Sequence, residues 1–291
     1  MGEACQLKPA QKVPRISVVT PVYNGEAFIG QTMDSIYNQS AILEGRLEFE
    51  HIIVDGLSKD RTPDVVEKHK SKNTTYIREK DNGMYDALAK GFRLCTGEIV
   101  CYLNSGDFYL PSAFDTIHSV FHDVGNKWFT AIPVHFGPQR MVTMADPPYR
   151  FRSDLIRKGA YGALLPYIQQ ESTFWKRELL AEVDLDRLSR FRLAGDYYLW
   201  WCFAQHHQLD VVHSILGGFS IQPGQLSENK DKYHEEVASF IEPIQWKDRI
   251  NIAVERLGWS TSPYYRRKLN RSSIEFDYTT NTWSRFSRKI W

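Results

Sequence analysis

The sequence predicts an α/β fold with a mainly parallel β-sheet, and three observations lead to this prediction. Short apolar, β-branched runs alternate with helical patterns from residue 15 onward. Each of the first runs ends in a polar turn. The chain has 291 residues, of which 42% are hydrophobic and 24% charged, as in globular proteins. Because strands that alternate with helices are joined by right-handed crossovers, the sheet that they form is parallel.

The first part of the chain contains two strand–helix units. Residues 16–20 (ISVVT) form an unbroken apolar run that ends at Pro21, which is typical of a strand buried on both faces. Apolar side chains then recur at helical spacing over 28–37. A second strand is predicted over 49–54. The helix that follows it, over 63–69, has a proline in its first turn, where proline fits.

Two further strands extend this sheet. A short strand is predicted over 75–78, a helix over 84–94 and a strand over 99–103 (IVCYL). The polar turns that follow the four strands are residues 23–25, 55–60, 80–86 and 104–107. Ligands of open α/β sheets bind beyond the carboxyl ends of the strands, so we expect the four turns to converge on one rim.

The second part of the chain is less regular. Helices are predicted over 112–121, 177–183 and 196–206, and strands over 130–136 and 209–215. The region between the first of these strands and the second helix is rich in loops and proline, which is typical of segments that contact substrate.

This pattern divides the chain into three parts. We expect a flexible N-terminus over 1–14, a single catalytic domain over 15–227 and a C-terminal extension over 228–291. The extension is polar and helical in character at first, and becomes basic and aromatic toward its end.

Charge and cysteine content exclude several classes of protein. With 36 Lys and Arg against 35 Asp and Glu, the net charge gives no support for nucleic-acid binding. The four cysteines lie far apart and form no zinc-binding or disulfide pattern, which favours a reducing compartment. The sequence contains neither a signal peptide nor 18 consecutive apolar residues, so we expect a cytoplasmic protein.

Aspartates, rather than glycine-rich loops, are the candidate ligands at the rim. The phosphate-binding motifs GxGxxG and GxxxxGK[ST] are absent. Asp55 follows the second strand and Asp107 the fourth. Carboxylates at such positions can hold Mg²⁺ or Mn²⁺, which bridge protein carboxylates to a diphosphate. The alternative is that each aspartate caps the turn or helix after its strand.

Five segments together resemble a known family. They are SVVTPVYNG (17–25), IIVDGLSKDRT (52–62), EKDNGMYDALAKG (79–91), TGEIVCYLNSGD (96–107) and LAGDYYLW (193–200). In this order and spacing they resemble the inverting glycosyltransferases of family 2, over about residues 15 to 225. The resemblance implies one GT-A domain with a mixed, mainly parallel sheet. It also implies transfer of a hexose-type sugar from a nucleotide diphosphate sugar, with a UDP-sugar expected. The acceptor would be a hydroxyl of a glycan or lipid-linked molecule in surface polysaccharide assembly.

The resemblance implies seven residues that bind the donor nucleotide, namely Pro21, Tyr23, Asp55, Lys80, Asp81, Asp86 and Asn104. Pro21 and Tyr23 would form the wall against which the base packs, and Asp55 would accept a hydrogen bond from the base. The segment 80–86 would line the ribose and diphosphate side, and Asn104 would bond the ribose. The structural alternatives are a core aromatic for Tyr23 and a solvated surface lysine for Lys80.

Two aspartates carry the chemistry that the resemblance implies. The turn that ends at Asp107 is similar to the family's DxD-type motif, whose last carboxylate ligates Mn²⁺ or Mg²⁺. Asn104 and Gly106 stand where relatives often have aspartate, which leaves one charge. Asp196 matches the catalytic base, which removes the proton from the acceptor hydroxyl. Its alternative role is that of an N-cap for the helix over 197–206.

Gln170, Glu171 and Trp200 are the candidate contacts to the acceptor or the donor sugar. The two polar residues lie where relatives often have a His-Gln pair. Trp200 and Trp201 are adjacent on a helix, so only one of them can face inward. The QxxRW pattern of processive synthases is absent, which favours transfer of one sugar per binding event. Residues 217–227 resemble the family's closing loop. The competing hypothesis is a non-catalytic GT-A domain that acts as a binding subunit of a polysaccharide-assembly complex.

The end of the chain gives a further expectation. Residues 263–291 hold seven Lys or Arg and two acidic residues, interleaved with the aromatic residues Tyr264, Tyr265, Trp283, Phe286 and Trp291. Such a segment favours peripheral contact with the inner face of a membrane, where a lipid-linked acceptor would be within reach. The alternative is that the segment packs on the domain or pairs two subunits of a homodimer.

Overall fold

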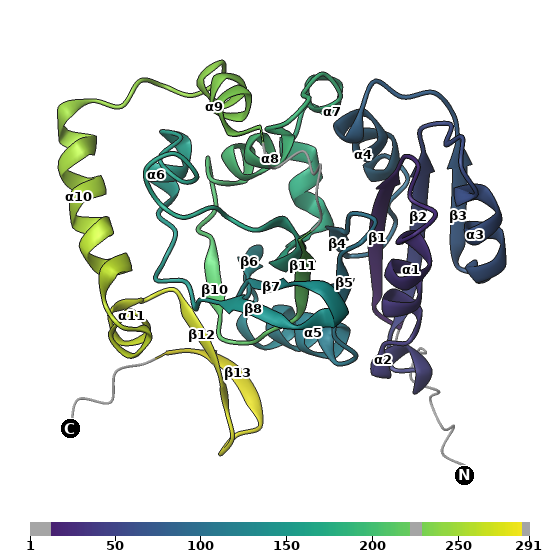
Figure 1. Cartoon of the computed structure of the whole chain (residues 1–291). Helices are drawn as coiled ribbons and strands as arrows, with labels where there is room; N and C mark the ends of the chain where they lie inside the picture. Colours follow the sequence, from purple (N-terminus) through teal and green to yellow (C-terminus); the bar gives the residue numbers. More distant parts are fainter. Residues whose placement is uncertain (1–12, 222–228, 287–291) are drawn as a thin grey trace, which may run out of the picture.

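The computed structural model describes residues 13–221 and 229–286, which are built around a nine-stranded mixed sheet (Figure 1). The strand order is β13-β12-β10-β6-β9-β4-β1-β2-β3. The pairs β1–β2, β1–β4, β2–β3, β6–β10 and β10–β12 are parallel, and the pairs made by β9 and β13 are antiparallel. The predicted α/β fold with a mainly parallel sheet is confirmed.

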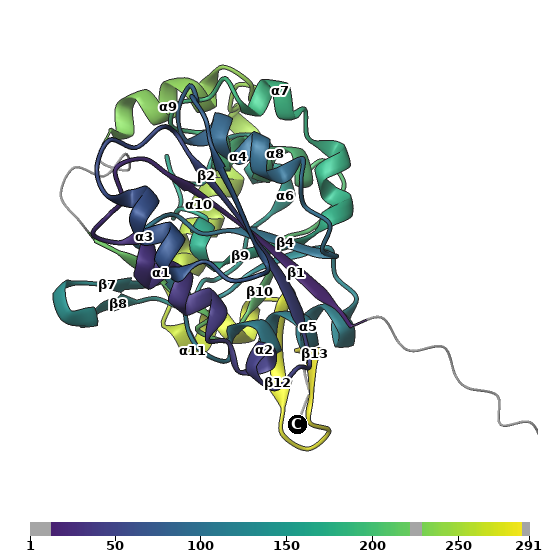
Figure 2. The same ribbon diagram turned by 90° about the vertical axis from the view of Figure 1, so that its right-hand side faces the viewer.

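The apolar runs of the first part of the chain form four neighbouring strands. These are β1 (Arg15–Val22), β2 (Glu48–Asp55), β3 (Thr74–Arg78) and β4 (Ile99–Tyr102). The helices between and beside them are α1 (Ile29–Tyr37), α2 (Ser40–Leu43), α3 (Thr62–His69) and α4 (Met84–Phe92). Side chains from Ile16 to Val22 are all buried because helices cover both faces of the sheet, as Figure 2 shows for α1 and α4.

The middle of the chain alternates short strands with short helices. The strands are β5 (Phe108–Tyr109), β6 (Trp128–Thr130), β7 (Val134–Phe136), β8 (Val142–Ala145), β9 (Thr173–Lys176), β10 (Asp210–Val212) and β11 (Gly217–Ser220). The helices are α5 (Ala113–Val124), α6 (Ser153–Arg157), α7 (Leu185–Leu188) and α8 (Gly195–Phe203). Strands β5, β11, β7 and β8 form a second sheet of four strands, in that order.

Two predictions for this middle region are wrong in detail. The strand expected over 130–136 is two strands, β6 in the large sheet and β7 in the small one. Pro133 lies between them and has no N–H with which to continue a ladder. The helix expected over 177–183 is a 3₁₀ helix, Arg177–Glu182.

The C-terminal extension is part of the fold. It contains α9 (Lys230–Ala238), α10 (Trp246–Ser260), α11 (Pro263–Leu269), β12 (Ser273–Asp277) and β13 (Thr282–Arg285). The last two strands were not expected from the sequence. Because β12 pairs with β10, the extension completes the edge of the large sheet. No helix of the described ranges is long and apolar enough to cross a membrane.

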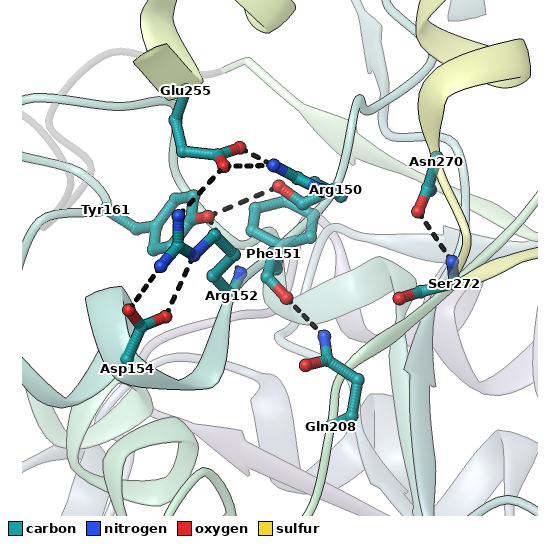
Figure 3. Close-up of polar contacts among 9 residues, drawn as sticks. All are labelled: Arg150, Phe151, Arg152, Asp154, Tyr161, Gln208, Glu255, Asn270 and Ser272. Atoms are coloured by element: carbon teal, nitrogen blue, oxygen red, sulfur yellow. Dashed lines mark hydrogen bonds and ion pairs between the residues drawn. The ribbon is translucent and has the colours of Figure 1, made fainter. Parts of the chain in front are cut away.

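A buried carboxylate fastens α10 to the domain (Figure 3). Glu255 has no exposed surface, and its Oε2 accepts a hydrogen bond from Arg150 Nε at 3.0 Å. Arg152 Nη1 lies 3.4 Å from the Glu255 Oε1 atom, and its other nitrogens bond to Asp154. A buried carboxylate without such partners would be strongly destabilising, so these two arginines hold the helix in place.

Candidate active site

The polar turns beyond the first strands meet at one edge of the sheet, as the sequence predicts. The backbone N–H of Asn24, after β1, donates to Ser58 Oγ, after β2, at 2.9 Å. A Cβ added to Gly56 would lie 2.4 Å from Asp81 Oδ2, so the turn after β3 also touches the turn after β2. A side chain at position 56 would therefore displace the Asp81 carboxylate.

A cavity of about 470 Å³ opens beside this rim. Its walls come from α4, the end of β4, β7, β11, the start of α8 and α9, together with the segment before β9. Four predicted site residues line it, namely Asn104, Asp107, Gln170 and Asp196. Much of the remaining wall is apolar or aromatic, and Lys230 is the cation among the lining residues. A volume of this size suits a small organic ligand.

Asp107 lies on the cavity wall just before β5. Asp107 is only 3% exposed. Oδ1 accepts a hydrogen bond from the backbone N–H of Ser220 at 3.0 Å, and Oδ2 accepts one from Gln170 Nε2 at 3.0 Å. Burial raises the pKa of the Asp107 carboxyl, and these two donors oppose the rise. No basic side chain of the described residues forms an ion pair with it, so its charge lacks a counter-ion.

Unpartnered oxygen atoms surround Asp107. Asn104 Oδ1, Ser105 Oγ and Gln170 Oε1 are all buried without a hydrogen-bond partner. Glu171, which is fully buried, has a free Oε2 and an electrostatic interaction with Asp107. Burial and the charge of Asp107 both raise the pKa of Glu171. Oxygen atoms of carboxylates, amides and hydroxyls are the ligands that Mg²⁺ and Mn²⁺ prefer. The donor set therefore fits a hard divalent cation.

These protein oxygens need a further ligand to complete the coordination of an ion. Among the described residues, no three His, Cys, Asp or Glu side chains form a group that could hold a metal ion. A single carboxylate with amide and hydroxyl oxygens matches the way Mg²⁺ is bound when a substrate supplies phosphate oxygens.

Asp196 lies in the first turn of α8 and faces the same cavity. Ala194 is the N-cap residue of this helix, so Asp196 is not its cap. Asp196 Oδ1 accepts a hydrogen bond from the N–H of Tyr197 at 2.7 Å. Burial raises the pKa of Asp196 to about 6, and hydrogen bonds from Tyr197 N–H and from the hydroxyl of Tyr233 oppose the rise, whereas Tyr85 Oη donates to the carbonyl of Leu193 at 2.8 Å. A carboxylate with this pKa is suited to accept a proton near neutral pH.

Glu236, on α9, holds the loop that leads into α8. Its Oε1 accepts from the N–H of Arg192 at 2.9 Å, and its Oε2 accepts from the N–H groups of Leu193 and Ala194, both at 2.8 Å. Three backbone donors thus converge on one carboxylate immediately before Asp196. The same helix contributes Tyr233 to the cavity.

The residues that were predicted to contact the nucleotide base lie at the rim and do not line the cavity. Tyr23 is 58% exposed, so it is not a core aromatic, and Pro21 is buried in β1. Asp55 is fully buried at the end of β2. Its Oδ1 accepts from the backbone N–H and the hydroxyl of Ser58, at 2.7 and 2.6 Å, and its Oδ2 accepts from Tyr76 Oη at 2.6 Å.

The segment after β3 also lies outside the cavity wall up to residue 83. Lys80 is exposed, and its carbonyl accepts a hydrogen bond from Lys90 Nζ at 2.8 Å. Asp81 Oδ1 accepts from the N–H of Gly83 at 2.9 Å, and burial raises the pKa of Asp81. Asp86 Oδ2 accepts from the N–H of Asn82 at 2.8 Å. Both aspartates therefore also shape the turn into α4.

Two of the three expected sugar contacts are not at the cavity. Trp200 is 1% exposed and stacks on Trp128, with ring centroids 5.8 Å apart, and it contacts Trp175 edge-on. It is a core residue because it faces the sheet from α8. Glu171 is fully buried and does not line the cavity. Gln170 does line it.

Several residues at this site have no motif in the sequence. Tyr233 and Glu236 lie in the C-terminal extension, and His135 lies on β7 with its buried Nε2 unpartnered. Tyr85, in contrast, lies within the segment 79–91 that resembles the family, so the sequence did point to it. The residues 222–227 of the expected closing loop lie outside the described ranges.

Comparison with known proteins agrees with this geometry. Residues 17–127 match the family model "Glycosyl transferase family 2". An uncharacterized glycosyltransferase of Rickettsia typhi is 27% identical over 209 residues, which cover 70% of this chain and 63% of that protein. The minor teichoic acid biosynthesis protein GgaB of Bacillus subtilis is 25% identical over 128 residues, 43% of this chain and 14% of that protein. The chain thus spans less than two thirds of the length of these two relatives.

A solved structure shows the fold. The crystal structure of residues 1–349 of Staphylococcus aureus TarS, in complex with UDP, matches with a TM-score of 0.56 and 18% sequence identity, and the match covers 88% of this chain and 69% of that one. The family match includes four of the five segments that carry the resemblance. The chain therefore has the GT-A fold, and its residues 17–127 are similar to the glycosyltransferases of family 2.

Proposed function

We propose that the protein is an inverting, metal-dependent glycosyltransferase. It would move a sugar from a nucleotide diphosphate sugar, with UDP as the nucleotide, to a hydroxyl of a glycan or lipid-linked acceptor. One observation carries the proposal: Asp107 and Asp196, from separate segments, line one cavity of about 470 Å³. One carboxylate lies among unpartnered oxygen atoms, and the other has the pKa of a base.

The donor nucleotide would lie along the rim, with its diphosphate directed into the cavity. Tyr23 is exposed and free to pack on a base, beside Pro21. Asp55 has no exposed surface, so its contact to a base would require the turn over 55–60 to shift when the donor binds. A carboxylate has about four acceptor sites, which leaves room for this further donor. Asn104 Oδ1 is unpartnered at the cavity wall, where a ribose hydroxyl could donate to it. UDP is bound by TarS, which supports the choice of nucleotide.

Asp107 would hold Mn²⁺ or Mg²⁺ together with oxygens of the diphosphate. When bound, the ion would offset the negative charge that develops on the leaving diphosphate. Lys80 at the rim and Lys230 at the cavity wall would add positive charge on the same side. Asp81 and Asp86 would shape the turn along the ribose and diphosphate.

Asp196 would act as the base. In its ionised form it takes the proton from the acceptor hydroxyl as that oxygen attacks the anomeric carbon. The bond from this carbon to the diphosphate oxygen breaks on the opposite face, so the configuration inverts. Tyr233 would hold the carboxylate in position through its hydroxyl group, and Tyr85 would hold the carbonyl of Leu193 in the loop before it. Gln170, which lines the same cavity as both aspartates, would contact a sugar hydroxyl.

The acceptor class is proposed from the relatives. GgaB is a minor teichoic acid biosynthesis protein, which supports an acceptor in surface polysaccharide assembly. The apolar and aromatic part of the cavity wall, which includes Tyr167 and Phe219, offers flat surfaces for a sugar ring.

Glu236 offers a first prediction. Replacing Glu236 with alanine should lower kcat about tenfold with little change in the KM for donor, because the loop before Asp196 loses its three hydrogen bonds and the base is misplaced. Steady-state kinetics of nucleotide release would measure this. Glu235, the exposed neighbour on α9, provides the matched control, and Glu235→Ala should behave as the wild type. Equal losses in both variants, or a change in KM alone, would contradict the positioning role.

A second candidate function is a non-catalytic GT-A subunit that binds partners. The replacement of two acidic positions by Asn104 and Gly106 favours it. Thermal unfolding in the presence of UDP-, GDP- and TDP-sugars with Mn²⁺ tests donor binding for both candidates. We expect UDP-sugars with Mn²⁺ to raise Tm most. The absence of any shift with all three nucleotides would contradict the proposed donor class.

A further inference from the structure

Helix α10 carries an exposed apolar stripe. Trp246, Ile250, Val254 and Leu257 are 66, 56, 54 and 70% exposed. Their spacing of three and four residues places them on one face of the helix. We call these four residues the α10 ridge. The helix lies at the edge of the molecule opposite β3, where no other described element covers this face (Figure 1).

The opposite face of α10 is fixed to the domain. Ile252, Glu255 and Trp259 are buried, and Glu255 is held by Arg150 and Arg152 (Figure 3). The buried face of α10 is packed on the domain, and this packing directs the ridge outward. The ridge is therefore exposed although the helix itself is firmly docked.

Cations flank the ridge. Lys247 and Arg249 are exposed on the same helix, and Lys268 is exposed on α11 beside the exposed aromatic residues Tyr264 and Tyr265. Within the described ranges none of the three cations forms an ion pair, although Lys268 Nζ lies 4.3 Å from the ring centroid of Tyr264. Long basic side chains beside apolar surface keep their charged ends directed toward the solvent or headgroup side.

Two acidic side chains lie near the ridge, and one of them is compensated by an ion pair. Asp248 accepts a hydrogen bond from the backbone N–H of Gln245 at 2.8 Å, in the capping box of α10. Glu242 is paired with Lys158. The hydrogen bond leaves the negative charge of Asp248 in place, but Lys247, Arg249 and Lys268 outnumber it, so the net charge along the ridge is positive.

We propose that the α10 ridge, together with Tyr264, Tyr265 and Lys268, binds the headgroup region of a bilayer that contains anionic lipid. An amphipathic helix with apolar and aromatic side chains on one face and cations beside them lies in that region, and each added basic group strengthens the attraction to anionic lipid. This proposal is independent of the sugar-transfer activity. It requires only the folded chain and a lipid surface.

The surface differs from the segment 263–291 that the sequence singled out. Arg266, Arg267 and Arg285 of that segment are paired with acidic side chains of the protein. Trp283 packs against the core beside α5, and its backbone N–H donates to Asp123 Oδ2 at 2.9 Å. Much of the segment therefore packs on the domain. Residues 287–291, including Arg288, Lys289 and Trp291, lie outside the described ranges.

Charge favours lipid over a second copy of this chain. In a symmetric dimer through the ridge, the same patch would face itself, so each copy would bring its Lys247 and Arg249 against a patch that carries the same cations. Like charges at an interface oppose association, whereas anionic headgroups complement them. We therefore assign the ridge to an anionic lipid surface.

Co-sedimentation of the full chain with vesicles tests this assignment. The vesicles are phosphatidylcholine, with or without phosphatidylglycerol, at low and high salt. We expect binding to the anionic vesicles alone, with salt weakening it. Ile250→Ser, Val254→Ser and Leu257→Ser together should abolish binding, and Lys247→Glu with Arg249→Glu should weaken it about tenfold or more. Leu43→Ser is the apolar control, since Leu43 is also 70% exposed, and Lys72→Glu is the charge control.

The outcomes separate the possibilities. Circular dichroism confirms that each variant is folded. Failure of the wild type to bind anionic vesicles at low salt would overturn the proposal, as would equal binding by the ridge variants. Concentration-dependent self-association in sedimentation velocity that the triple serine variant abolishes, without any lipid binding, would assign the ridge to a second copy.

Discussion

Replacing Asp196 with asparagine is expected to lower sugar-transfer turnover by about a hundredfold or more, while donor binding is retained. The amide keeps the size of the side chain and an oxygen that can accept from Tyr197 N–H, but it cannot take a proton from the acceptor. Measurement of kcat by nucleotide release, and of donor affinity by calorimetry, would separate the two effects.

The pH profile provides the specific signature of this base. Burial raises the pKa of Asp196 to about 6, so the ionised base is lost as pH falls below that value. We expect the activity of the wild type to rise with pH through about 6 and then level. This limb should vanish in Asp196→Asn. Asp184 is a capping aspartate that accepts from two backbone N–H groups at the start of α7, and Asp184→Asn is the matched control. Near-normal turnover in Asp196→Asn, with only lower stability, would contradict the base role.

Replacing Asp107 with asparagine should weaken Mn²⁺-dependent donor affinity by at least about tenfold. Loss of partners that merely support a metal ligand costs about 10- to 100-fold in affinity or activity, and here the ligand itself loses its charge. The N–H of Ser220 can still donate to the amide oxygen, so the local fold should persist. Calorimetric titration of UDP with and without Mn²⁺ measures the effect.

A comparison with Asp55→Asn makes this test specific. Asp55 would contact the base, away from the ion, so its replacement should weaken UDP binding to the same extent with and without Mn²⁺. Asp107→Asn should instead remove the difference between the two conditions. Unchanged dependence on Mn²⁺ in Asp107→Asn would exclude Asp107 from the metal site.

The sequence predicts the strands and their shared edge because that information is local. The runs that form β1, β2, β3 and β4 are apolar in themselves, and parallel topology then brings their polar turns together. Asn104, Asp107, Gln170 and Asp196 could be assigned to one cavity on this basis together with the family resemblance.

Features that depend on distant partners could not be predicted in the same way. Trp200 and Trp201 are neighbours of the same residue type, and only packing against Trp128 shows which one faces the core. The strands β12 and β13 depend on the free edge of β10, far away in the sequence. Glu236 is one of several acidic residues in a polar helix, and its role depends on three N–H groups that approach it from the loop before α8.

Release of UDP from UDP-sugars, measured with Mn²⁺ and after its removal by a chelator, tests the proposed activity most directly. The proposed chemistry predicts release that requires the ion and disappears in Asp107→Ala. Nucleotide binding without release under any of these conditions, even with glycan and lipid-linked acceptors present, would contradict it and would indicate a binding subunit instead.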